Sequence, residues 1–326
     1  MKWLITGGCG FIGRALITKL LATGDHQVRV LDNLSVGNRS DLQHVAAFNE
    51  ISSNGDIWSS RLEFLEGDIL DPEAVKASLS GVDVVVHLAA NTGVGPSVVD
   101  PMADCRTNVI GTLNLLEGCR DADVGRFVFA SSGAPLGVQT PPLNEHMAPH
   151  PASPYGASKL SGEGYCSAYY HCFGVETVAL RFSNVYGEGS GHKQSVVAKF
   201  IKEALQGQTL ELYGDGTQTR DFIYISDLIA AIECAATISG IGGETFQIAT
   251  AEETTVREMT DVLIAALESE GIPRPKTCFG DMRDGDVTRN YSDTAKAKMH
   301  LGWQARVPLN EGLRRTIKYF IKTMAS

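Results

Sequence analysis

Two residues one helical turn apart, Tyr155 and Lys159, could together transfer a proton. They lie in SPYGASKLSGEGYCSAYY, where Ser153 and Pro154 are typical of a helix start. Residues i and i+4 share one face of a helix, so the ammonium would lie near the phenol. A tyrosine with a pKa of ~10 is a weak base at neutral pH, but a neighbouring cation favours the phenolate. The pair therefore predicts a general base, the alternative being two surface residues on a helix.

Three glycines near the N-terminus have the spacing of a dinucleotide-binding turn. Gly7, Gly10 and Gly13 form G-x-x-G-x-x-G between an expected strand at 3–6 and an expected helix at 11–23. Glycine permits a tight turn and lets backbone N–H groups approach a pyrophosphate, while the helix N-terminus adds partial positive charge. A glycine triplet alone is weak evidence, because a plain turn can have the same spacing.

An acidic residue strengthens this motif. Asp32 lies 19 residues after Gly13, at the end of the second expected strand (28–32). A carboxylate there can accept hydrogen bonds from the adenosine ribose and would repel a 2′-phosphate. The sequence therefore predicts NAD rather than NADP. The positive nicotinamide ring would add to the effect of Lys159 on the Tyr155 phenol.

The elements that must position these residues alternate over the first half of the chain. Nearly continuous apolar segments alternate with amphipathic ones, as in parallel strands covered by helices on both faces. The expected strands are 3–6, 28–32, 62–68, 82–89 and 126–132, and the expected helices are 11–23, 72–79 and 102–119. With right-handed crossovers, this pattern predicts an α/β fold built on a doubly wound parallel (Rossmann) sheet. The segment 35–60 is expected to be a surface loop with one irregular helix.

The pattern changes after Leu180. A glycine-rich loop, RFSNVYGEGSGHKQ, precedes an amphipathic helix at 196–205, and further helices are expected at 256–269 and 309–322. We expect a smaller α/β substrate lobe here. The predicted division is an NAD-binding domain at 1–182, with 221–249 as a segment that could return to it, and a substrate-binding lobe at 183–220 and 250–326.

The composition excludes several classes of protein. The 326 residues are 43% hydrophobic and 20% charged, unlike a disordered chain, a collagen-like fibre or a coiled coil. A net charge of -10, from 28 basic and 38 acidic residues, argues against a nucleic-acid partner. No apolar run approaches the ~18 residues of a membrane span, and the N-terminus lacks a signal-peptide pattern. We therefore expect a cytoplasmic protein with no membrane partner.

Cysteine and histidine give no metal signature. The seven cysteines are scattered without a CxxC pair, which indicates reduced thiols. His146 and His150 are four residues apart, but the prolines of PPLNEHMAPHP prevent a shared helical face. No metal site is expected.

Further motifs extend the pattern over nearly the whole chain. They are TGGCGFIG (6–13), DNLSVGN (32–38), EGDI (66–69), HLAA (87–90), NVIGTLNLL (108–116), SS (131–132), YGASK (155–159), LRFSNVYG (180–187), YGDGTQTRDFIYISD (213–227) and RDGDV (283–287). In this order they resemble the extended short-chain dehydrogenase/reductase family, most closely its nucleotide-sugar epimerase and dehydratase branch.

The resemblance implies roles for individual residues. Ser132 would hydrogen-bond the sugar hydroxyl that Tyr155 deprotonates, and Lys159 would also hold the nicotinamide ribose. The residues implied to bind NAD are Gly7, Gly10, Phe11, Ile12, Gly13, Asp32, Asn33, Asp68, Ile69, Leu88, Ala89, Ala90, Tyr155 and Lys159.

On the substrate side, the resemblance implies a UDP-sugar ligand. Asn184 would reach the sugar, and Tyr213 would stack on the nucleobase. Arg220 and Arg283 would clamp the diphosphate, a task that suits the bidentate guanidinium. Without the resemblance, surface ion pairing by the two arginines and a turn-capping Asn184 would be the simpler interpretations.

The sequence departs from the family pattern directly after Ser132. The family usually continues x-x-V-Y-G, whereas this chain has the segment 133–137, Gly-Ala-Pro-Leu-Gly. Relatives that dehydrate or decarboxylate nucleotide sugars resemble one another in an acidic residue just after the catalytic Ser or Thr. Gly133 and Ala134 cannot ionise, so both chemistries lose their catalyst. Pro135 and Leu136 are expected to alter the sugar pocket.

The leading hypothesis is a UDP-sugar 4-epimerase that inverts C4 through a transient 4-keto sugar. The alternatives are a UDP-glucuronate 4-epimerase, or a nucleotide-sugar dehydratase, decarboxylase or reductase of the same fold. An alternative from another class is a non-catalytic NAD or nucleotide sensor.

Asn290 occupies a position that in the resembling epimerases forms part of the hexose pocket wall. In these relatives a bulky Tyr at this position goes with restriction to plain hexoses, whereas a small residue leaves room at the C2 substituent. Because Asn is far smaller than Tyr, N-acetylated hexosamines are expected to be accepted. The resemblance also implies a homodimer formed through 102–119 and 155–173.

Overall fold

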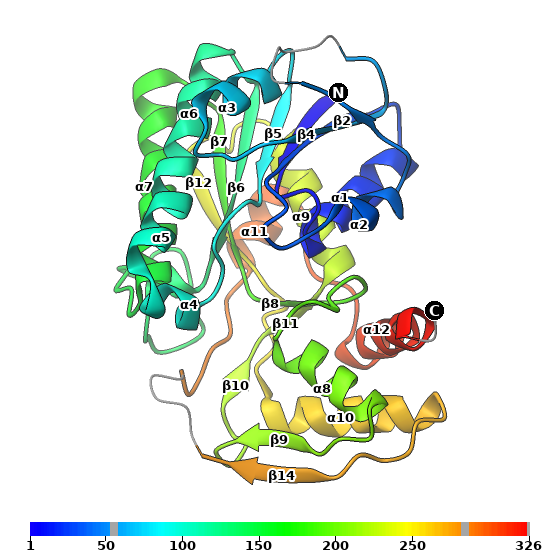
Figure 1. Cartoon of the computed structure of the whole chain (residues 1–326). Coiled ribbons are helices and arrows are strands. Elements are labelled where there is room, and N and C mark those ends of the chain that lie inside the picture. Colours follow the sequence, from blue (N-terminus) through cyan, green and yellow to red (C-terminus); the bar gives the residue numbers. More distant parts are fainter. Residues whose placement is uncertain (53–57, 282–286, 325–326) are drawn as a thin grey trace.

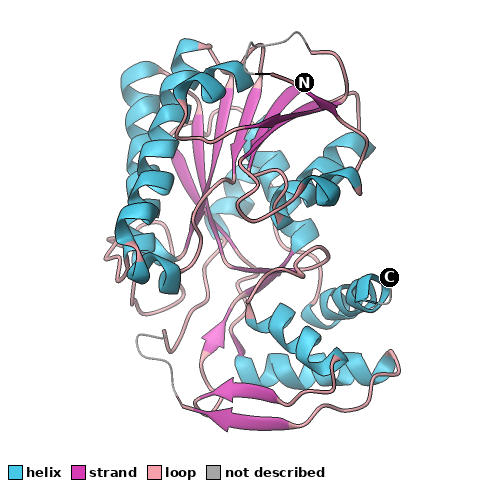
Figure 2. Cartoon of the chain, in the orientation of Figure 1, coloured by secondary structure: helices cyan, strands magenta, loops and turns pink. Residues whose placement is uncertain are grey.

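The computed structural model describes residues 1–52, 58–281 and 287–324. Its largest element is an eight-stranded sheet with the order β12-β7-β6-β5-β1-β2-β4-β3 (Figure 1; Figure 2). The strands are β1 (Lys2–Thr6), β2 (Gln27–Asp32), β3 (Asn49–Glu50), β4 (Leu62–Glu66), β5 (Val84–His87), β6 (Arg126–Ser132), β7 (Thr177–Phe182) and β12 (Glu244–Ile248). All seven pairings are parallel. The predicted doubly wound parallel sheet is therefore confirmed.

The strand order explains where a ligand can enter. The chain winds outward from β1 in one direction through β2 and β4, and in the other through β5, β6 and β7. At such a reversal, the loops after the two central strands part and leave a crevice at the carboxyl edge of the sheet. The crevice lies where β1 and β5 end, beside the glycine turn.

Helices cover both faces of the sheet (Figure 1). The helices α1 (Phe11–Ala22) and α9 (Ile225–Thr237) pack on one face, and α3 (Pro72–Ser78), α6 (Gly111–Asp121) and α7 (Pro154–Phe173) pack on the other. Side chains of β1 alternate between the two layers. Trp3 and Ile5 pack with α1, whereas Leu4 packs with α3 and α6. Burial on both sides explains why these strands are almost uniformly apolar.

The helix expected at 102–119 is not a single α-helix. It consists of α5 (Pro101–Cys105), one π-helical turn (Arg106–Ile110) and α6, and a short helix α4 (Val94–Val99) precedes it. In the π-turn, the Asn108 amide accepts a bond from Asn91 N at 2.8 Å and donates to Asn91 O at 2.9 Å. These bonds to a neighbouring loop accompany the wider turn, a feature often found at functional sites.

The rest of the chain forms a smaller lobe below the sheet (Figure 1). Its helices are α8 (Val196–Leu205), α10 (Val256–Ser269) and α12 (Leu309–Met324), which agree with the expected positions. Its strands form three two-stranded pairs: β8 (Asn184–Tyr186) with β11 (Phe222–Tyr224), β9 (Leu210–Tyr213) with β14 (Thr277–Gly280), and β10 (Thr219–Arg220) with β13 (Thr254–Thr255).

Two later segments return to the large sheet. After β11 the chain forms α9, which packs on α1, and then β12, which pairs with β7. The helix α11 (Ala295–Leu301) also contacts β12 and α9. The described part of the segment 35–60, expected to be a surface loop with one irregular helix, contains the short helix α2 (Arg39–Gln43) and, in addition, the strand β3.

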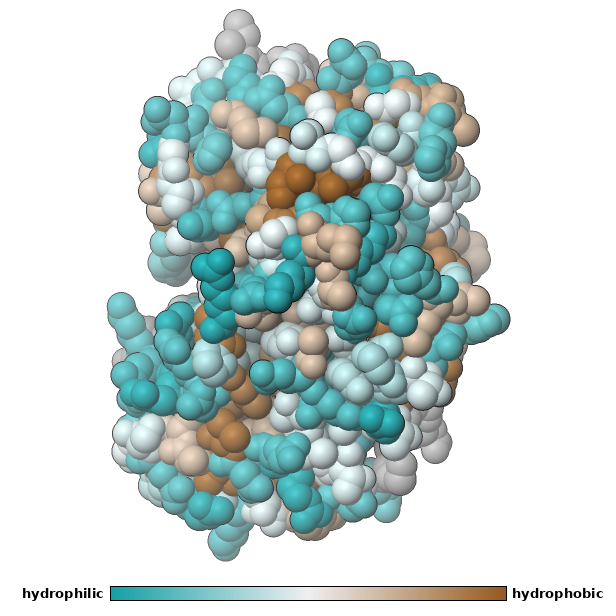
Figure 3. All heavy atoms as spheres, turned by 180° about the vertical axis from the view of Figure 1, so that it is seen from behind, coloured by the Kyte–Doolittle hydropathy of each residue, from teal (hydrophilic) through white to brown (hydrophobic). Residues whose placement is uncertain are grey.

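The described residues contain no helix with the length and apolarity needed to cross a membrane. Seen from behind, the surface is mostly hydrophilic or neutral, with small hydrophobic patches between (Figure 3).

Candidate active site

A cavity of about 730 Å³ opens at the carboxyl edge of the sheet, with walls from both lobes. One wall contains the glycine turn and the ends of β2, β5 and β6. The opposite wall contains β9, Arg220 and the loop before α8. A site of this size at a reversal in strand order is the usual place for a dinucleotide.

The glycine turn fits a closely approaching ligand. Gly7 has a positive φ of 69°, and a Cβ there would lie 2.8 Å from Ala89 N. A Cβ on Gly13 would lie 2.6 Å from the Cα of Gly8, so glycine is needed for the contact of α1 with the turn. No side chain of the described residues caps the start of α1 at Gly10. The first N–H groups of this helix can therefore bind a pyrophosphate.

The acidic end of the cavity is preorganised. Asp32 is nearly buried, and its two carboxylate oxygens accept backbone N–H bonds from Cys9 and Leu34, both at 2.9 Å. These bonds fix the carboxylate at the cavity wall, where its remaining lone pairs can accept ribose hydroxyls. Asn33 donates to Asp68 at 2.9 Å, which places a second carboxylate on this wall. The glycine cradle and the fixed carboxylate fit NAD.

Ser132, the last residue of β6, lies beside Tyr155 and Lys159 in the first turns of α7. Ser153 caps α7 by accepting the N–H of Gly156 at 3.1 Å, which orients the first turn that carries Tyr155. The Lys159 ammonium donates to Ala130 O at 2.8 Å and lies 5.9 Å from the centroid of the Tyr155 ring. All three side chains line the cavity.

The expected lowering of the Tyr155 pKa included the positive nicotinamide ring, and the protein chain alone shifts the pKa the other way. Burial raises the pKa of Tyr155 to about 12, although its hydrogen bond with Ser132 lowers the pKa, and the carboxylate of Asp104 raises it further. Burial also lowers the pKa of Lys159 to about 8, opposed first by Asp104. In the protein chain alone, the cost of burying a phenolate outweighs the effect of the Ser132 hydrogen bond, and a bound cation would oppose this cost.

Two buried carboxylates near this centre were missed from the sequence. Glu163, one turn after Lys159 on α7, accepts Ser131 Oγ at 2.5 Å and pairs with Arg181 of β7 at 2.7 Å. This pair fixes the end of β6 beside Ser132. A polar arginine inside an apolar strand was the available signal.

The second missed carboxylate is Asp104, on α5. Its side chain is buried, one oxygen accepts Asn108 Nδ2 at 2.9 Å, and the other has no partner among the described residues. The same Asn108 nitrogen donates to Ser158 Oγ at 3.1 Å, and Ser158 donates to the carbonyl of Tyr155 at 3.0 Å. A chain of hydrogen bonds therefore links the π-turn to the start of α7.

The predicted substrate residues lie partly in the same cavity. Asn184, Tyr213 and Arg220 line it. One terminal nitrogen of Arg220 donates to the carbonyls of Thr219 and Val287 at 2.7 and 2.6 Å, which fixes the guanidinium at the wall.

The other two predicted substrate residues differ. Asn290 is half-buried, its backbone N–H donates to Thr219 Oγ1 at 3.2 Å, and it is not part of the cavity wall formed by the described residues. Arg283 lies outside the described residues.

The segment after Ser132 forms a short 3-10 turn at Ala134–Leu136, with Pro135 and Leu136 buried. The carboxylates among the described lining residues are Asp32, Asp68 and Glu211, which come from β2, from the loop after β4 and from β9. None of them directly follows Ser132 in the sequence, where Gly133 and Ala134 stand.

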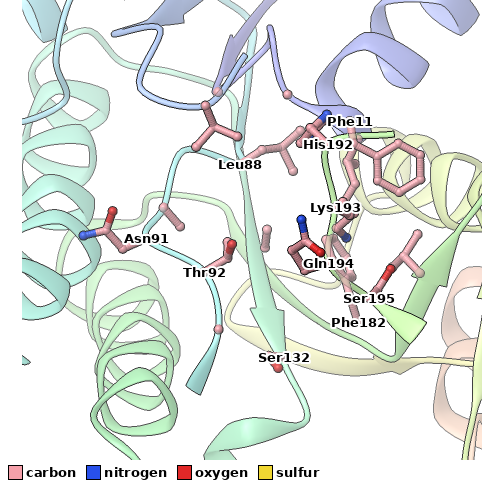
Figure 4. Close-up of a pocket in the computed structure, with 18 of the residues that line it drawn as sticks. Phe11, Leu88, Asn91, Thr92, Ser132, Phe182, His192, Lys193, Gln194 and Ser195 are labelled. Carbon is pink, nitrogen blue, oxygen red and sulfur yellow. The ribbon is translucent and has the colours of Figure 1, made fainter. Parts of the chain in front are cut away.

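One wall of the cavity was not anticipated at all. His192, Lys193, Gln194 and Ser195, from the loop read only as glycine-rich, line the cavity beside Phe11. Figure 4 shows Phe11, His192, Lys193 and Gln194 together on one side, across from Asn91 and Thr92. A lysine and a histidine next to the glycines were the available signal.

Comparisons with known proteins show the family of this chain. A model of the NAD dependent epimerase/dehydratase family matches residues 3–249. The UDP-glucose 4-epimerase of Mycolicibacterium smegmatis is 36% identical over 330 residues, with 98% of each chain covered.

Two solved structures resemble the whole molecule. UDP-glucose 4-epimerase of Thermotoga maritima, with UDP-glucose, has a TM-score of 0.87 and 36% identity, over 99% of this chain and 100% of that one. UDP-glucuronic acid 4-epimerase from Bacillus cereus, in complex with UDP-glucuronic acid and NAD, has a TM-score of 0.86 and 30% identity, over 99% of this chain and 100% of that one. Because the family match spans both the glycine turn and the Tyr155–Lys159 pair, this chain belongs to the NAD-dependent epimerase/dehydratase family.

Proposed function

We propose that this protein inverts C4 of a UDP-sugar, of the UDP-glucose or UDP-N-acetylglucosamine type, through a transient 4-keto sugar. The observation that carries the proposal is the pairing of Tyr155 with Ser132 in a cavity where no described carboxylate comes from the positions directly after Ser132. This arrangement can oxidise and reduce a sugar alcohol but lacks the acid needed for the further steps of dehydration.

The fit of the glycine turn and Asp32 supports NAD as the resident cofactor. The N–H groups at the start of α1 would hold its pyrophosphate, and Asp32 would accept its ribose hydroxyls. When bound, NAD supplies a hydride acceptor in the first half of the reaction and a hydride donor in the second.

The protein's own residues manage the proton. Tyr155 takes the C4 hydroxyl proton as C4 loses its hydride and the C–O single bond becomes a carbonyl. Ser132 holds the same oxygen by a hydrogen bond. The positive charge of Lys159 stabilises the phenolate that accepts this proton. After the keto sugar has turned, Tyr155 would return the proton to the C4 oxygen as C4 regains a hydride on its other face.

The cavity wall that contains Tyr213 and Arg220, here called the substrate wall, would keep the nucleotide in place while the sugar turns. Arg220 would clamp the diphosphate with charge-assisted bonds, and Tyr213 would stack on the base. We retain Arg283 as a second clamp and Asn290 as a pocket residue on the strength of the sequence pattern alone. Holding the nucleotide preserves proximity of the reacting atoms through the keto intermediate.

A UDP-glucuronate 4-epimerase is the second candidate, supported by the likeness to the Bacillus cereus enzyme. It would use the same residues on a substrate with a carboxylate at C5. An NADPH-using reductase fits less well, because Asp32 would repel a 2′-phosphate.

We also propose a homodimer. Met102, Ile110, Tyr165 and Phe173 are exposed on the segments 102–119 and 155–173, which the family resemblance assigned to the interface, and Val98 and Val99 are exposed on the preceding α4. An unpartnered surface of this kind is typical of an association site.

The experiment that tests the function is a panel of UDP-glucose, UDP-N-acetylglucosamine and UDP-glucuronate, each incubated with purified protein and no added NAD. We expect at least one to be converted into its 4-epimer. A deoxy or decarboxylated product, or no conversion of any of the three, would contradict the proposal.

A further inference from the structure

The loop at residues 187–195, here called the strap, connects the two lobes across the cofactor side of the cavity. It leaves β8 and returns to α8, both in the smaller lobe. Between them it reaches α1 of the large domain, where Arg14 donates to the Gly189 carbonyl at 3.0 Å. Arg14 is itself fixed by an ion pair with Asp41 at 3.2 Å. Gly189 has a positive φ of 84°, and a Cβ there would lie 3.6 Å from the Phe11 ring.

The backbone of the strap is also fixed from its own lobe. Lys202 of α8 donates to the carbonyls of Gly191 and Lys193 at 3.0 and 2.9 Å. The N–H of Lys193 donates to Ser190 O at 2.9 Å, and the buried Ser190 hydroxyl donates to Gly187 O at 2.7 Å. These bonds fix the direction in which the Lys193 side chain leaves the strap, and this side chain lines the cavity (Figure 4).

Lys193 carries a cation that the described protein atoms do not neutralise. Its ammonium lies 5.0 Å from the centroid of the Phe11 ring, and no carboxylate or hydrogen-bond acceptor of the described residues contacts it. Burial lowers its pKa, with no opposing effect from an acid. A cation placed against an aromatic ring in a partly desolvated wall needs an anion to offset the cost of burial.

The position of Lys193 identifies the anion. Phe11 is the first residue of α1, and the free N–H groups of this turn are where a dinucleotide pyrophosphate binds. We propose that the strap is a cofactor clasp, in which Lys193 of the smaller lobe binds the pyrophosphate of the NAD held by the glycine turn of the large domain. The clasp closes over a cofactor that has to stay bound through a turnover. It depends on NAD binding and is independent of which sugar is epimerised.

A second lysine of the same segment provides a matched control. Lys199 lies six residues further on and also lines the cavity, but its ammonium is 3.4 Å from the Tyr213 hydroxyl and 5.1 Å from the Tyr213 ring. Lys199 therefore lies on the substrate wall, beside Tyr213, where the nucleotide of the proposed substrate would bind. Replacing Lys193 or Lys199 with Met removes the same charge while keeping a similar chain length.

The test measures binding of NADH by fluorescence, and of UDP by calorimetry, on protein freed of nucleotide. For Lys193→Met we expect the Kd for NADH to rise about tenfold, the size of one charge-assisted bond, with UDP affinity within about twofold. For Lys199→Met we expect the reverse. Lys193→Arg should keep most of the NADH affinity, because the charge remains.

Several results would overturn the clasp. They are an unchanged NADH Kd in Lys193→Met, a loss confined to UDP, or an equal loss for both ligands. Circular dichroism of each variant checks the fold. Because no sugar turnover enters the measurement, failure of the clasp and failure of the proposed epimerase activity can be told apart.

Discussion

The two walls of the cavity are built by different means. The cofactor wall is mostly backbone: glycines that no larger residue can replace, helix N–H groups and a carboxylate fixed by two backbone bonds. The substrate wall is mostly side chains, with Arg220 and Tyr213 on or beside short strands. One wall rests on an eight-stranded sheet, and the other on pairs of two strands. Two-stranded pairs are marginal alone and depend on packing against helices.

This difference matches the different demands on the two ligands. In the proposed epimerisation, the cofactor is regenerated in each cycle and benefits from a rigid, preformed site, since little is lost in ordering the protein on binding. The sugar of the proposed substrate has to rotate in the pocket, which needs an anchored nucleotide and an open pocket. Variants of the two walls should therefore separate cofactor retention from substrate binding.

The largest effect is expected where the walls meet. Tyr155→Phe removes only the phenolic oxygen, so the fold and NAD binding should persist while kcat falls at least ~10²-fold, the lower range for general acid–base catalysis. Tyr213→Phe is the matched control, because it removes a hydroxyl from the substrate wall and should cost about tenfold or less. Steady-state kinetics and the NAD content of each protein provide the comparison. Near-normal turnover in Tyr155→Phe would disprove its assignment as the base.

A moderate effect, confined to the substrate wall, is expected for Arg220→Ala. Loss of charge-assisted bonds to the diphosphate should raise KM about tenfold and leave NAD content unchanged. Arg289→Ala is the control, since Arg289 is exposed and pairs with Glu253 at 2.7 Å away from the cavity wall. If KM were the same in both variants, the diphosphate would be bound elsewhere.

A smaller effect, on pH dependence, is expected for Asp104→Asn. The Asp104 carboxylate raises the pKa of both Tyr155 and Lys159, so its neutralisation lowers both. Tyr155 acts as a base in its deprotonated form, and the rising limb of kcat against pH should therefore move to lower pH. Asp121→Asn, at the exposed end of the adjoining α6, should leave the profile in place. A shift to higher pH, or none, would show that Asp104 does not act on the phenol.

The smallest effect is expected for Asn290→Tyr, because Asn290 is outside the described cavity wall but next to Thr219. A bulky ring there should reduce turnover of UDP-N-acetylglucosamine several-fold more than that of UDP-glucose, by a change of about 1 kcal/mol, in the range for one pocket group. Competition between the two substrates in one reaction measures this ratio directly. An unchanged ratio would remove Asn290 from the sugar pocket.

The sequence predicted the large domain better than the smaller lobe, for a physical reason. Buried parallel strands have to be apolar and a pyrophosphate turn has to be glycine, so β1, β2 and Gly7 leave local patterns. The sequence offered 221–249, which contains β12, as a segment that could return to the large domain, whereas the return of α11 depends on tertiary packing that no local pattern encodes. Lys193 and Asp104 were missed because their roles depend on residues far away in sequence, Phe11 and Ser158. The burial that raises the pKa of Tyr155 in the protein chain alone cannot be predicted from residue spacing.

The most direct test of the central claim is the reaction of UDP-glucose with purified protein in D₂O, without added NAD, followed by NMR. If a hydride leaves C4 and returns to its other face, UDP-galactose should form with the original hydrogen still on C4. If UDP-glucose is inert, UDP-N-acetylglucosamine and UDP-glucuronate are tested in the same way. Deuterium at C4 of the epimer, a 4-keto-6-deoxy product, or no conversion of any of the three sugars would contradict the account.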